Sequence, residues 1–210
     1  MKNYKLTFQN ITKTFGRRLI FKNINQEFTS GNVYGFAGNN GSGKSTLVKI
    51  AAGIISPTKG EVVHKDDDKI IISEKLHNFI GFVSPYLVLY DEFTAEENLM
   101  HISKIRGINY NEEFAKHLLN EFKIYDRRED YLKGYSSGML QRMKFIFALL
   151  HSPKLLFLDE PTSNLDNIGK DKVYEIIEKE SKDKLVIVAS NEESDLALCS
   201  KVLEIEKFKN

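Results

Sequence analysis

The sequence contains little cysteine, no long apolar run and almost no net charge. Its single cysteine, Cys199, cannot form a disulfide within the chain, which favours a reducing cytoplasm and predicts a small buried hydrophobic side chain. The longest apolar run, FIFALL, is far shorter than the roughly 20 residues that span a bilayer. The first ten residues also lack the apolar core of a signal peptide. We therefore expect any membrane role to come through a partner protein.

The near absence of net charge also limits the choice of partners. There are 30 Lys and Arg against 29 Asp and Glu, a formal charge of +1. The overall charge therefore does not favour nucleic acid or an anionic membrane surface as a partner. Charged residues (28%) and hydrophobic residues (41%) occur at frequencies ordinary for a globular protein. We expect residues 1–210 to form a single domain.

Alternating apolar and polar residues predict short strands at 4–36 and again at 60–83. The acidic stretch 66–68 falls between two of the later strands. It is interpreted as a solvated hairpin turn, with a metal site as the alternative. Beyond residue 150, strands alternate with helices, which is typical of a mainly parallel sheet. The pattern predicts an α/β fold with an N-terminal antiparallel β subdomain.

A helical period replaces the strand pattern over about 91–150. Thr94 and Glu97 fit a capping box, in which each side chain satisfies a backbone N–H of the other residue. Asn111 is suited to cap a second helix, and a third is predicted from about Ser136 to Leu150. We interpret this block as a helical subdomain inserted into the strand-rich chain.

The stretch GNNGSGKST, residues 38–46, fits the pattern of a phosphate-binding loop between an apolar strand and a helix. Glycines allow backbone N–H groups to surround phosphate, and the helix adds its positive N-terminus. Lys44 is predicted to reach the β- and γ-phosphates, and the Ser45 hydroxyl to bind Mg²⁺. The alternative is a simple glycine-rich turn. The predicted nucleotide-binding residues of this loop are Gly38, Asn39, Asn40, Gly41, Ser42, Gly43, Lys44, Ser45 and Thr46.

A second candidate site follows the apolar strand LLFLD, which ends at Asp159 and is followed by Glu160. In open α/β sheets, ligands bind at the carboxyl ends of the strands. Asp159 is suited to contact Mg²⁺, and Glu160 to polarise an attacking water. The alternative is a strand end that carries two solvated acids.

YSSGMLQR at 135–142, followed by LLFLDEPTSNLD at 155–166, resembles the nucleotide-binding domain of ABC-transporter ATPases. The motifs stand in the family's order, and the resemblance covers essentially the whole chain. It implies a phosphate-loop NTPase fold with a RecA-like core, with ATP and Mg²⁺ as cofactors. It also implies ATP hydrolysis coupled to transport.

In that family, two nucleotide-binding domains close head to tail over two ATP molecules. The signature of one domain contacts the γ-phosphate held by the other. Ser136, Ser137 and Gly138 match the signature and open a helix, where they present a hydroxyl and free N–H groups. A plain helix cap is the alternative. The resemblance implies a homodimer, an integral membrane permease as partner, a cytoplasmic position on the inner face of the cell membrane, and no nucleic-acid partner.

Two further matches concern adenine and the dimer interface. Phe15 matches the aromatic residue that stacks on adenine, although a core position in a strand pair is the alternative. The loop Ser163–Asp166 matches the segment that crosses the dimer interface beside the catalytic centre. Asp166 is also suited to cap the next helix, and the two roles are compatible.

Three positions depart from the family pattern. Pro85 aligns with a Gln that contacts Mg²⁺ or the attacking water, and Pro has no side-chain donor or acceptor. The adjacent Tyr86 carries a hydroxyl with a different reach. Asn191 replaces a His that contacts the γ-phosphate, and Ser137 replaces a Gly, which adds a Cβ near the phosphate. We expect a competent but slow ATPase in which Glu160 acts on water and Asn191 partly replaces the His.

The apolar, aromatic segment 86–90 is interpreted either as a docking face for a membrane subunit or as part of the interior of the helical subdomain. A soluble ABC-type ATPase with slow hydrolysis, acting as a nucleotide-dependent switch on a non-membrane partner, is an alternative function. The chain has neither the second cassette nor the long coiled coil typical of such proteins. The signature argues against a small-molecule kinase.

Overall fold

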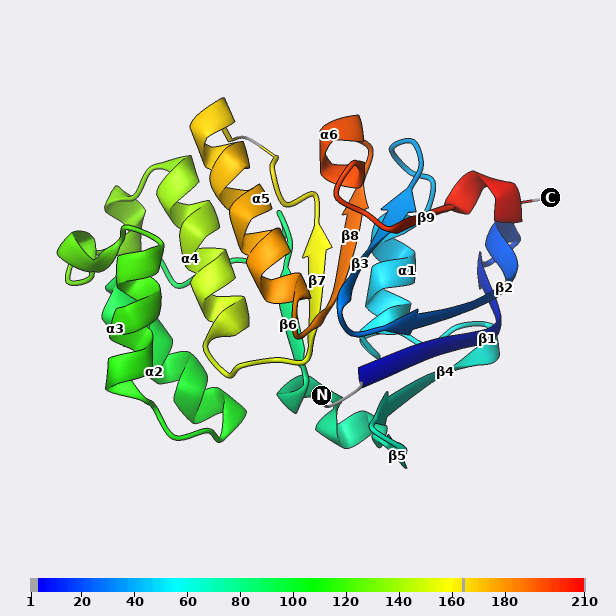
Figure 1. Cartoon of the computed structure of the whole chain (residues 1–210), viewed down its shortest axis with the longest axis horizontal. Coiled ribbons are helices and arrows are strands. Elements are labelled where there is room, and N and C mark those ends of the chain that lie inside the picture. Colours follow the sequence, from blue (N-terminus) through cyan, green and yellow to red (C-terminus); the bar gives the residue numbers. More distant parts are fainter. Residues whose placement is uncertain (1–3, 164, 210) are drawn as a thin grey trace.

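A computed structural model describes residues 4–163 and 165–209. It contains two sheets and an inserted group of helices. A four-stranded antiparallel sheet has the order β2-β1-β4-β5, and a five-stranded sheet has the order β6-β7-β8-β3-β9. The inserted helices lie at one end of the molecule and the antiparallel sheet lies at the other, with the five-stranded sheet between them (Figure 1). The α/β fold predicted from the sequence is confirmed.

The antiparallel sheet is built from two long strands and two shorter ones. They are β1 (Tyr4–Phe15), β2 (Arg18–Thr29), β4 (Lys59–Asp66) and β5 (Lys69–Ile70). The prediction of short strands at the N-terminus is therefore wrong for β1 and β2, which have twelve residues each. Their pairing shifts register between Phe8 and Ile11, and Asn10 and Asn23 have positive φ. Such bulges interrupt the alternation of side chains, which made each long strand resemble shorter ones.

All pairings in the five-stranded sheet are parallel. Its strands are β3 (Asn32–Ala37), β6 (Ile80–Val83), β7 (Leu155–Asp159), β8 (Leu185–Ser190) and β9 (Lys201–Glu204). Because the strands run in the same direction, the loops that follow β3, β6, β7 and β8 emerge at the same edge of the sheet. The phosphate loop, Pro85, Glu160 and Asn191 lie on these four loops.

Four of the helices begin at caps predicted from the sequence, namely Thr94, Asn111, Ser136 and Asp166. The helices are α1 (Lys44–Ala51), α2 (Ala95–Arg106), α3 (Glu112–Glu121), α4 (Ser137–Leu149), α5 (Asn167–Ser181) and α6 (Glu193–Leu196). Short 3₁₀ helices cover Ser73–Asn78, Tyr125–Arg127, Leu132–Gly134 and Ile205–Phe208. Thr94 and Glu97 form the capping box of α2, and Asn111 caps α3. No helix in the described parts of the chain is both long and apolar enough to cross a bilayer.

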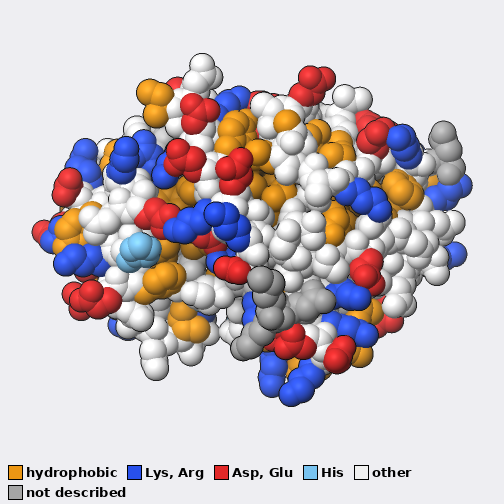
Figure 2. All heavy atoms as spheres, in the orientation of Figure 1, with side chains coloured by type: hydrophobic (Ala, Val, Ile, Leu, Met, Phe, Trp, Pro, Cys, Tyr) orange, Lys and Arg blue, Asp and Glu red, His pale blue; other side chains and the backbone are white. Residues whose placement is uncertain are grey.

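Two hydrophobic cores lie on opposite faces of the parallel sheet. One packs α2–α5 against the sheet and contains Leu156 and Leu158 of β7. The other packs α1 and the antiparallel sheet against the opposite face and contains Leu155 and Phe157. Burial on both faces explains why β7 is a continuous apolar run rather than an alternating one. The outer surface is mixed: Lys and Arg side chains are interspersed with Asp and Glu across the visible face (Figure 2).

A buried histidine links the antiparallel sheet to the helix after the phosphate loop. The His64 Nε2 lies 2.8 Å from the carbonyl oxygen of Ala51 at the end of α1. A carbonyl can only accept, so Nε2 donates, and Nδ1 is left to accept from the Tyr4 hydroxyl at 2.8 Å. His64 is therefore neutral in this arrangement. Burial lowers the pKa of His64 to about 4.

The acidic stretch 66–68 forms the turn between β4 and β5. Asp66 pairs with Lys154 across the sheet edge, and Asp67 adopts positive φ. Within residues 4–163 and 165–209, no group of three His, Cys, Asp or Glu side chains is arranged to hold a metal ion. Because β4 and β5 pair antiparallel on either side of the turn, the hairpin interpretation of this stretch is confirmed. Cys199 is partly buried rather than fully buried.

We predict that His64 makes the protein sensitive to mild acid. The folded-state pKa of about 4 lies below the usual 6.5, so the unfolded state binds the extra proton first as the pH falls. The stability that this group contributes is complete above about pH 6.5 and is lost progressively towards pH 4. Between pH 7 and pH 5, this loss amounts to about 1–2 kcal/mol.

The variant His64→Gln should be less stable at pH 7 but should lose less stability between pH 7 and pH 5. Urea unfolding at both pH values measures the difference. The buried His151, whose pKa is also lowered to about 4, is present in both proteins and serves as an internal control. Equal losses for the variant and the unmodified protein would contradict the assignment.

Candidate functional site

The phosphate loop turns sharply between β3 and α1 through glycines that no other residue can replace. Gly38 and Gly43 have φ of +153° and +114°. A Cβ on Gly43 would lie 2.6 Å from a side-chain atom of Ile20. Gly43 caps α1 without a side-chain hydrogen bond, so the first N–H groups of the helix remain available to an anion. The buried Ser42 hydroxyl, which has no partner among the described residues, adds another donor.

Lys44 projects from the first residue of α1 and is almost fully buried. Its Nζ donates to the Gly38 carbonyl oxygen at 2.8 Å and lies 3.3 Å from an Oε1 of Glu160. The ammonium group therefore sits between the loop and the acidic end of β7. Asn39 differs from the rest of the loop, because its backbone N–H donates to Glu206 at 2.9 Å.

Ser45 and Asp159 meet directly. The Ser45 Oγ donates to Asp159 Oδ1 at 3.1 Å. Asp159 is only 1% exposed, and its Oδ2 is buried without a hydrogen-bond partner in the described structure. Burial raises the pKa of Asp159, and the Ser45 hydrogen bond opposes this effect. An orphaned carboxylate oxygen beside a hydroxyl oxygen is a donor set that fits Mg²⁺.

Glu160 follows β7 in the left-handed region, with φ of +49°. Its N–H donates to the Ala189 carbonyl oxygen of β8 at 2.8 Å, which fixes the turn. The carboxylate then faces Lys44 on one side and lies 3.4 Å from the Ser190 Oγ on the other. Burial raises the pKa of Glu160, whereas the Lys44 charge lowers it.

A cleft of about 730 Å³ brings most of the predicted residues together. It is lined by Phe15, Arg18, Ile20, Asn40, Gly41, Ser42, Gly43, Lys44, Ser45, Thr46, Pro85, Tyr86, Glu160, Ser163, Asn191 and Glu192. Gly38, Asn39 and Asp159 are not among the lining residues, although Gly38 and Asp159 hydrogen-bond directly to Lys44 and Ser45. Arg18 was not predicted: it pairs with Phe15 at the β1–β2 turn, and a single Arg in a turn gives no sequence signal.

Phe15 lies at the rim of the cleft rather than in a core. Its side chain is 52% exposed, and Lys13 Nζ lies 4.9 Å from the ring centroid. The core alternative for Phe15 is therefore wrong. A flat apolar face beside a phosphate-binding loop is suited to a planar base.

The three positions that depart from the family pattern have distinct surroundings. Pro85 and Asn191 both line the cleft, next to Tyr86 and Glu160. Tyr86 is 76% exposed, with Lys49 Nζ 5.9 Å from its ring centroid. Ser137 is the first residue of α4 and has no positive φ, so its Cβ imposes no backbone strain.

The signature residues lie away from the cleft of their own chain. The Ser136 Oγ caps α4 by accepting from Met139 N at 3.3 Å. None of Ser136, Ser137 and Gly138 lines the cleft, so one chain does not bring the signature and the phosphate loop together. Of the loop Ser163–Asp166, Asn164 lies outside the described residues. Asp166 caps α5 by accepting from Gly169 N at 2.8 Å, as predicted.

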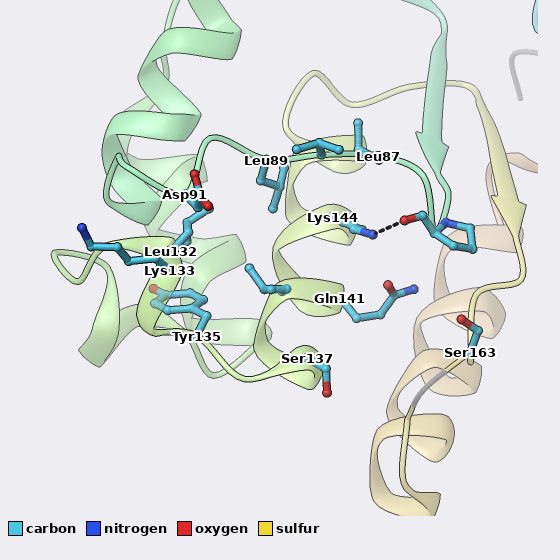
Figure 3. Close-up of a pocket in the computed structure, with 13 residues that line it drawn as sticks. Leu87, Leu89, Asp91, Leu132, Lys133, Tyr135, Ser137, Gln141, Lys144 and Ser163 are labelled. Atoms are coloured by element: carbon cyan, nitrogen blue, oxygen red, sulfur yellow. Dashed lines mark hydrogen bonds between the residues drawn. The ribbon is translucent and has the colours of Figure 1, made fainter.

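A second cavity, of about 500 Å³, lies between the loop after β6 and α4. Its lining includes Ser137, Leu87, Leu89 and Lys144 (Figure 3). Lys144 Nζ donates to the carbonyl oxygens of Ser84 and Pro85, both at 3.1 Å. This contact ties the signature helix to the loop whose Pro85 also lines the nucleotide cleft.

In the apolar segment 86–90, some side chains are exposed, as a docking face requires, and one is buried. Tyr86, Val88 and Tyr90 are exposed by 76%, 86% and 56%, whereas Leu89 is 7% exposed and packs in the core. The segment therefore anchors itself through one side chain and presents three others to the outside.

Comparisons with known proteins agree with this geometry. The model of the ABC transporter family matches residues 21–163. The lantibiotic transport ATP-binding protein SrtF of Streptococcus pyogenes is 34% identical over 186 residues, which cover 89% of this chain and 79% of SrtF. The lipoprotein-releasing system ATP-binding protein LolD of Leptospira interrogans is 32% identical over 202 residues, covering 93% and 85%.

A solved structure from Pyrococcus furiosus, described as an ABC transporter ATP-binding protein, superposes with a TM-score of 0.83 and 25% identity. The match covers 98% of this chain and all of that one. The phosphate loop, the acidic strand end and these matches give one conclusion. The chain belongs to the ABC transporter family, as an ATP-binding subunit with ATPase activity.

Proposed function

We propose that two copies of this ATPase close head to tail, with each ATP held between the phosphate loop of one copy and the signature of the other. The main observation in favour of this proposal is that the phosphate loop and the N-terminus of α4, the two candidate anion sites, lie apart. The cleft holds the phosphate loop and Glu160, whereas the N-terminus of α4 opens elsewhere. A helix N-terminus with free N–H groups favours anions. A symmetric pair would use both sites at once.

Within each site, the residues of this chain have separate roles. The α1 N-terminus and Lys44 bind the phosphates, and Phe15 stacks on adenine. Ser45 and Asp159 would hold Mg²⁺, which neutralises charge on the transferring phosphoryl group. Glu160 orients the attacking water and accepts its proton, because its carboxylate is fixed beside Lys44 by the strained turn after β7.

Hydrolysis is proposed to be slow because two positions in the cleft lack the Gln and His side chains that the family usually has there. Pro85 offers no side-chain donor or acceptor to the water. Asn191 offers an amide, which is shorter than imidazole and carries no charge. Both residues line the same cleft as Glu160, which is where hydrolysis is proposed to take place.

The partner is proposed to be an integral membrane permease that docks on the segment 86–90 and the cavity beside it. Exposed apolar side chains at Tyr86, Val88 and Tyr90 favour a protein contact. Lys144 connects this surface to the signature helix. The subunit would then lie at the cytoplasmic face of the cell membrane. The named relatives are transport proteins, which favours this function over a soluble switch.

We predict that Glu160→Gln slows ATP turnover by about 100-fold or more, because an amide cannot accept the proton of the attacking water. Steady-state phosphate release from purified protein measures the effect. Glu192→Gln is the matched control, since Glu192 carries the same charge in the same cleft and pairs with Lys170. It should change turnover by less than about twofold. Equal turnover for Glu160→Gln and the unmodified protein would show that another group acts on water.

We predict that Val88→Asp weakens docking to the permease by about tenfold or more, because a charge would be buried without a partner. The measurement is recovery of a membrane-spanning protein from solubilised membranes of the source cell. Ile70→Asp is the matched control, because Ile70 is an exposed apolar residue on β5, far from this segment in the sequence. ATP turnover of both purified variants should stay unchanged, because neither residue lines the cleft. Undiminished recovery with Val88→Asp would place the docking face elsewhere.

A further inference from the structure

A fully buried carboxylate lies behind the cleft. Asp195, on the short helix α6, is 0% exposed and does not line the cleft. Three hydroxyls surround it: Thr162 Oγ1 at 2.9 Å, Tyr174 OH at 3.0 Å and Ser190 Oγ at 2.7 Å. Each of the three hydroxyls donates its single proton to an oxygen of the Asp195 side chain. Burial of a polar side chain is costly without such hydrogen-bond partners. We call Asp195 and its three hydroxyl donors the Asp195 junction.

Two of the three donors belong to the segments that carry the proposed catalytic residues. Thr162 lies two residues after Glu160, and Ser190 immediately precedes Asn191. The Ser190 Oγ also accepts from Glu192 N at 3.1 Å, which fixes the turn at Asn191. The third donor, Tyr174, lies on α5 and does not line the cleft.

We propose that Asp195 is a positioning residue for ATP hydrolysis, which holds the segments carrying Glu160 and Asn191 in register at the carboxyl ends of β7 and β8. The need for such a junction follows from the left-handed φ of +49° at Glu160. A backbone conformation of this kind persists only where the surroundings fix it. The backbone bond from Glu160 N to Ala189 fixes one side of the turn. The Thr162–Asp195 contact fixes the other.

The chain offers a matched pair of substitutions that separates positioning from simple stability. Asp195→Ala would remove the acceptor shared by all three hydroxyls at once, and unfolding would hide any effect on catalysis. Thr162→Val and Tyr174→Phe each remove one hydroxyl donor from the same carboxylate while nearly preserving the shape of the side chain. Only Thr162 belongs to the segment that carries Glu160. Their contact distances, 2.9 and 3.0 Å, are nearly equal.

The experiment measures melting temperature, kcat and KM for ATP in both purified variants. Both should melt at lowered temperatures, because each loses a hydrogen bond to the buried Asp195 carboxylate. Thr162→Val should lower kcat by roughly tenfold and change KM by less than about twofold. Tyr174→Phe should keep the kcat of the unmodified protein. In a Glu160→Gln background, Thr162→Val should lower the residual turnover by less than about twofold, because the group that it positions is already lost.

Two results would overturn the positioning role. One is an equal effect of the two variants on kcat, which would make the junction a matter of stability alone. The other is a full tenfold loss from Thr162→Val in the Glu160→Gln background. The proposal rests on the proposed role of Glu160, and the two remain separable. If Glu160→Gln alone keeps normal turnover, the role of Glu160 fails; if it is slow but Thr162→Val is normal, only the role of Asp195 fails.

Discussion

The parallel pairing of β6, β7, β8 and β3 is the constraint on which the rest of this structure depends. Because these strands run in one direction, the loops that follow them meet at one edge of the sheet. The phosphate loop after β3 and the acidic pair at the end of β7 are 114 positions apart at Ser45 and Asp159, yet these side chains are 3.1 Å apart. The two hydrophobic cores hold the sheet from both faces and keep that edge rigid.

Under the proposed head-to-tail pairing, one copy alone does not contain a complete ATP site. One edge of the sheet carries the groups proposed to bind phosphate and activate water, whereas the signature lies at the start of α4. Lys144 on that helix holds the loop that carries Pro85. Movement of α4 relative to the sheet would therefore reach both the nucleotide cleft and the exposed side chains of segment 86–90. In the proposed complex, this link would connect the ATP site physically to the docked permease.

Much of the site could be predicted because its motifs are local. The glycine loop, the capping box at Thr94 and the carboxylates at the end of β7 each depend on residues a few positions apart. The length of β1 and β2 could not be predicted, because the bulges near Asn10 and Asn23 break the alternation. Which side chains of segment 86–90 are buried depends on where Leu89 packs, and this is known only from the tertiary structure.

The Asp195 junction also lay beyond sequence reasoning. Its donors are 33, 21 and 5 positions away, and a Thr, a Tyr and a Ser carry no pattern until the fold brings them together. Lys144 is similar, since its acceptors are backbone carbonyls 59 and 60 positions away. Backbone acceptors have no residue identity, so no motif marks them.

The central claim is that each ATP site is shared between two copies, and cross-complementation tests it most directly. Lys44→Ala removes the phosphate-binding ammonium. Gly138→Asp places a negative charge at the signature, where a Cβ meets only Leu165 at 3.9 Å, so the fold tolerates it. Each variant alone should be inactive. A mixture should regain ATP turnover, because a mixed pair contains one site with an intact phosphate loop and an intact signature. A mixture as inactive as its components would contradict the shared site.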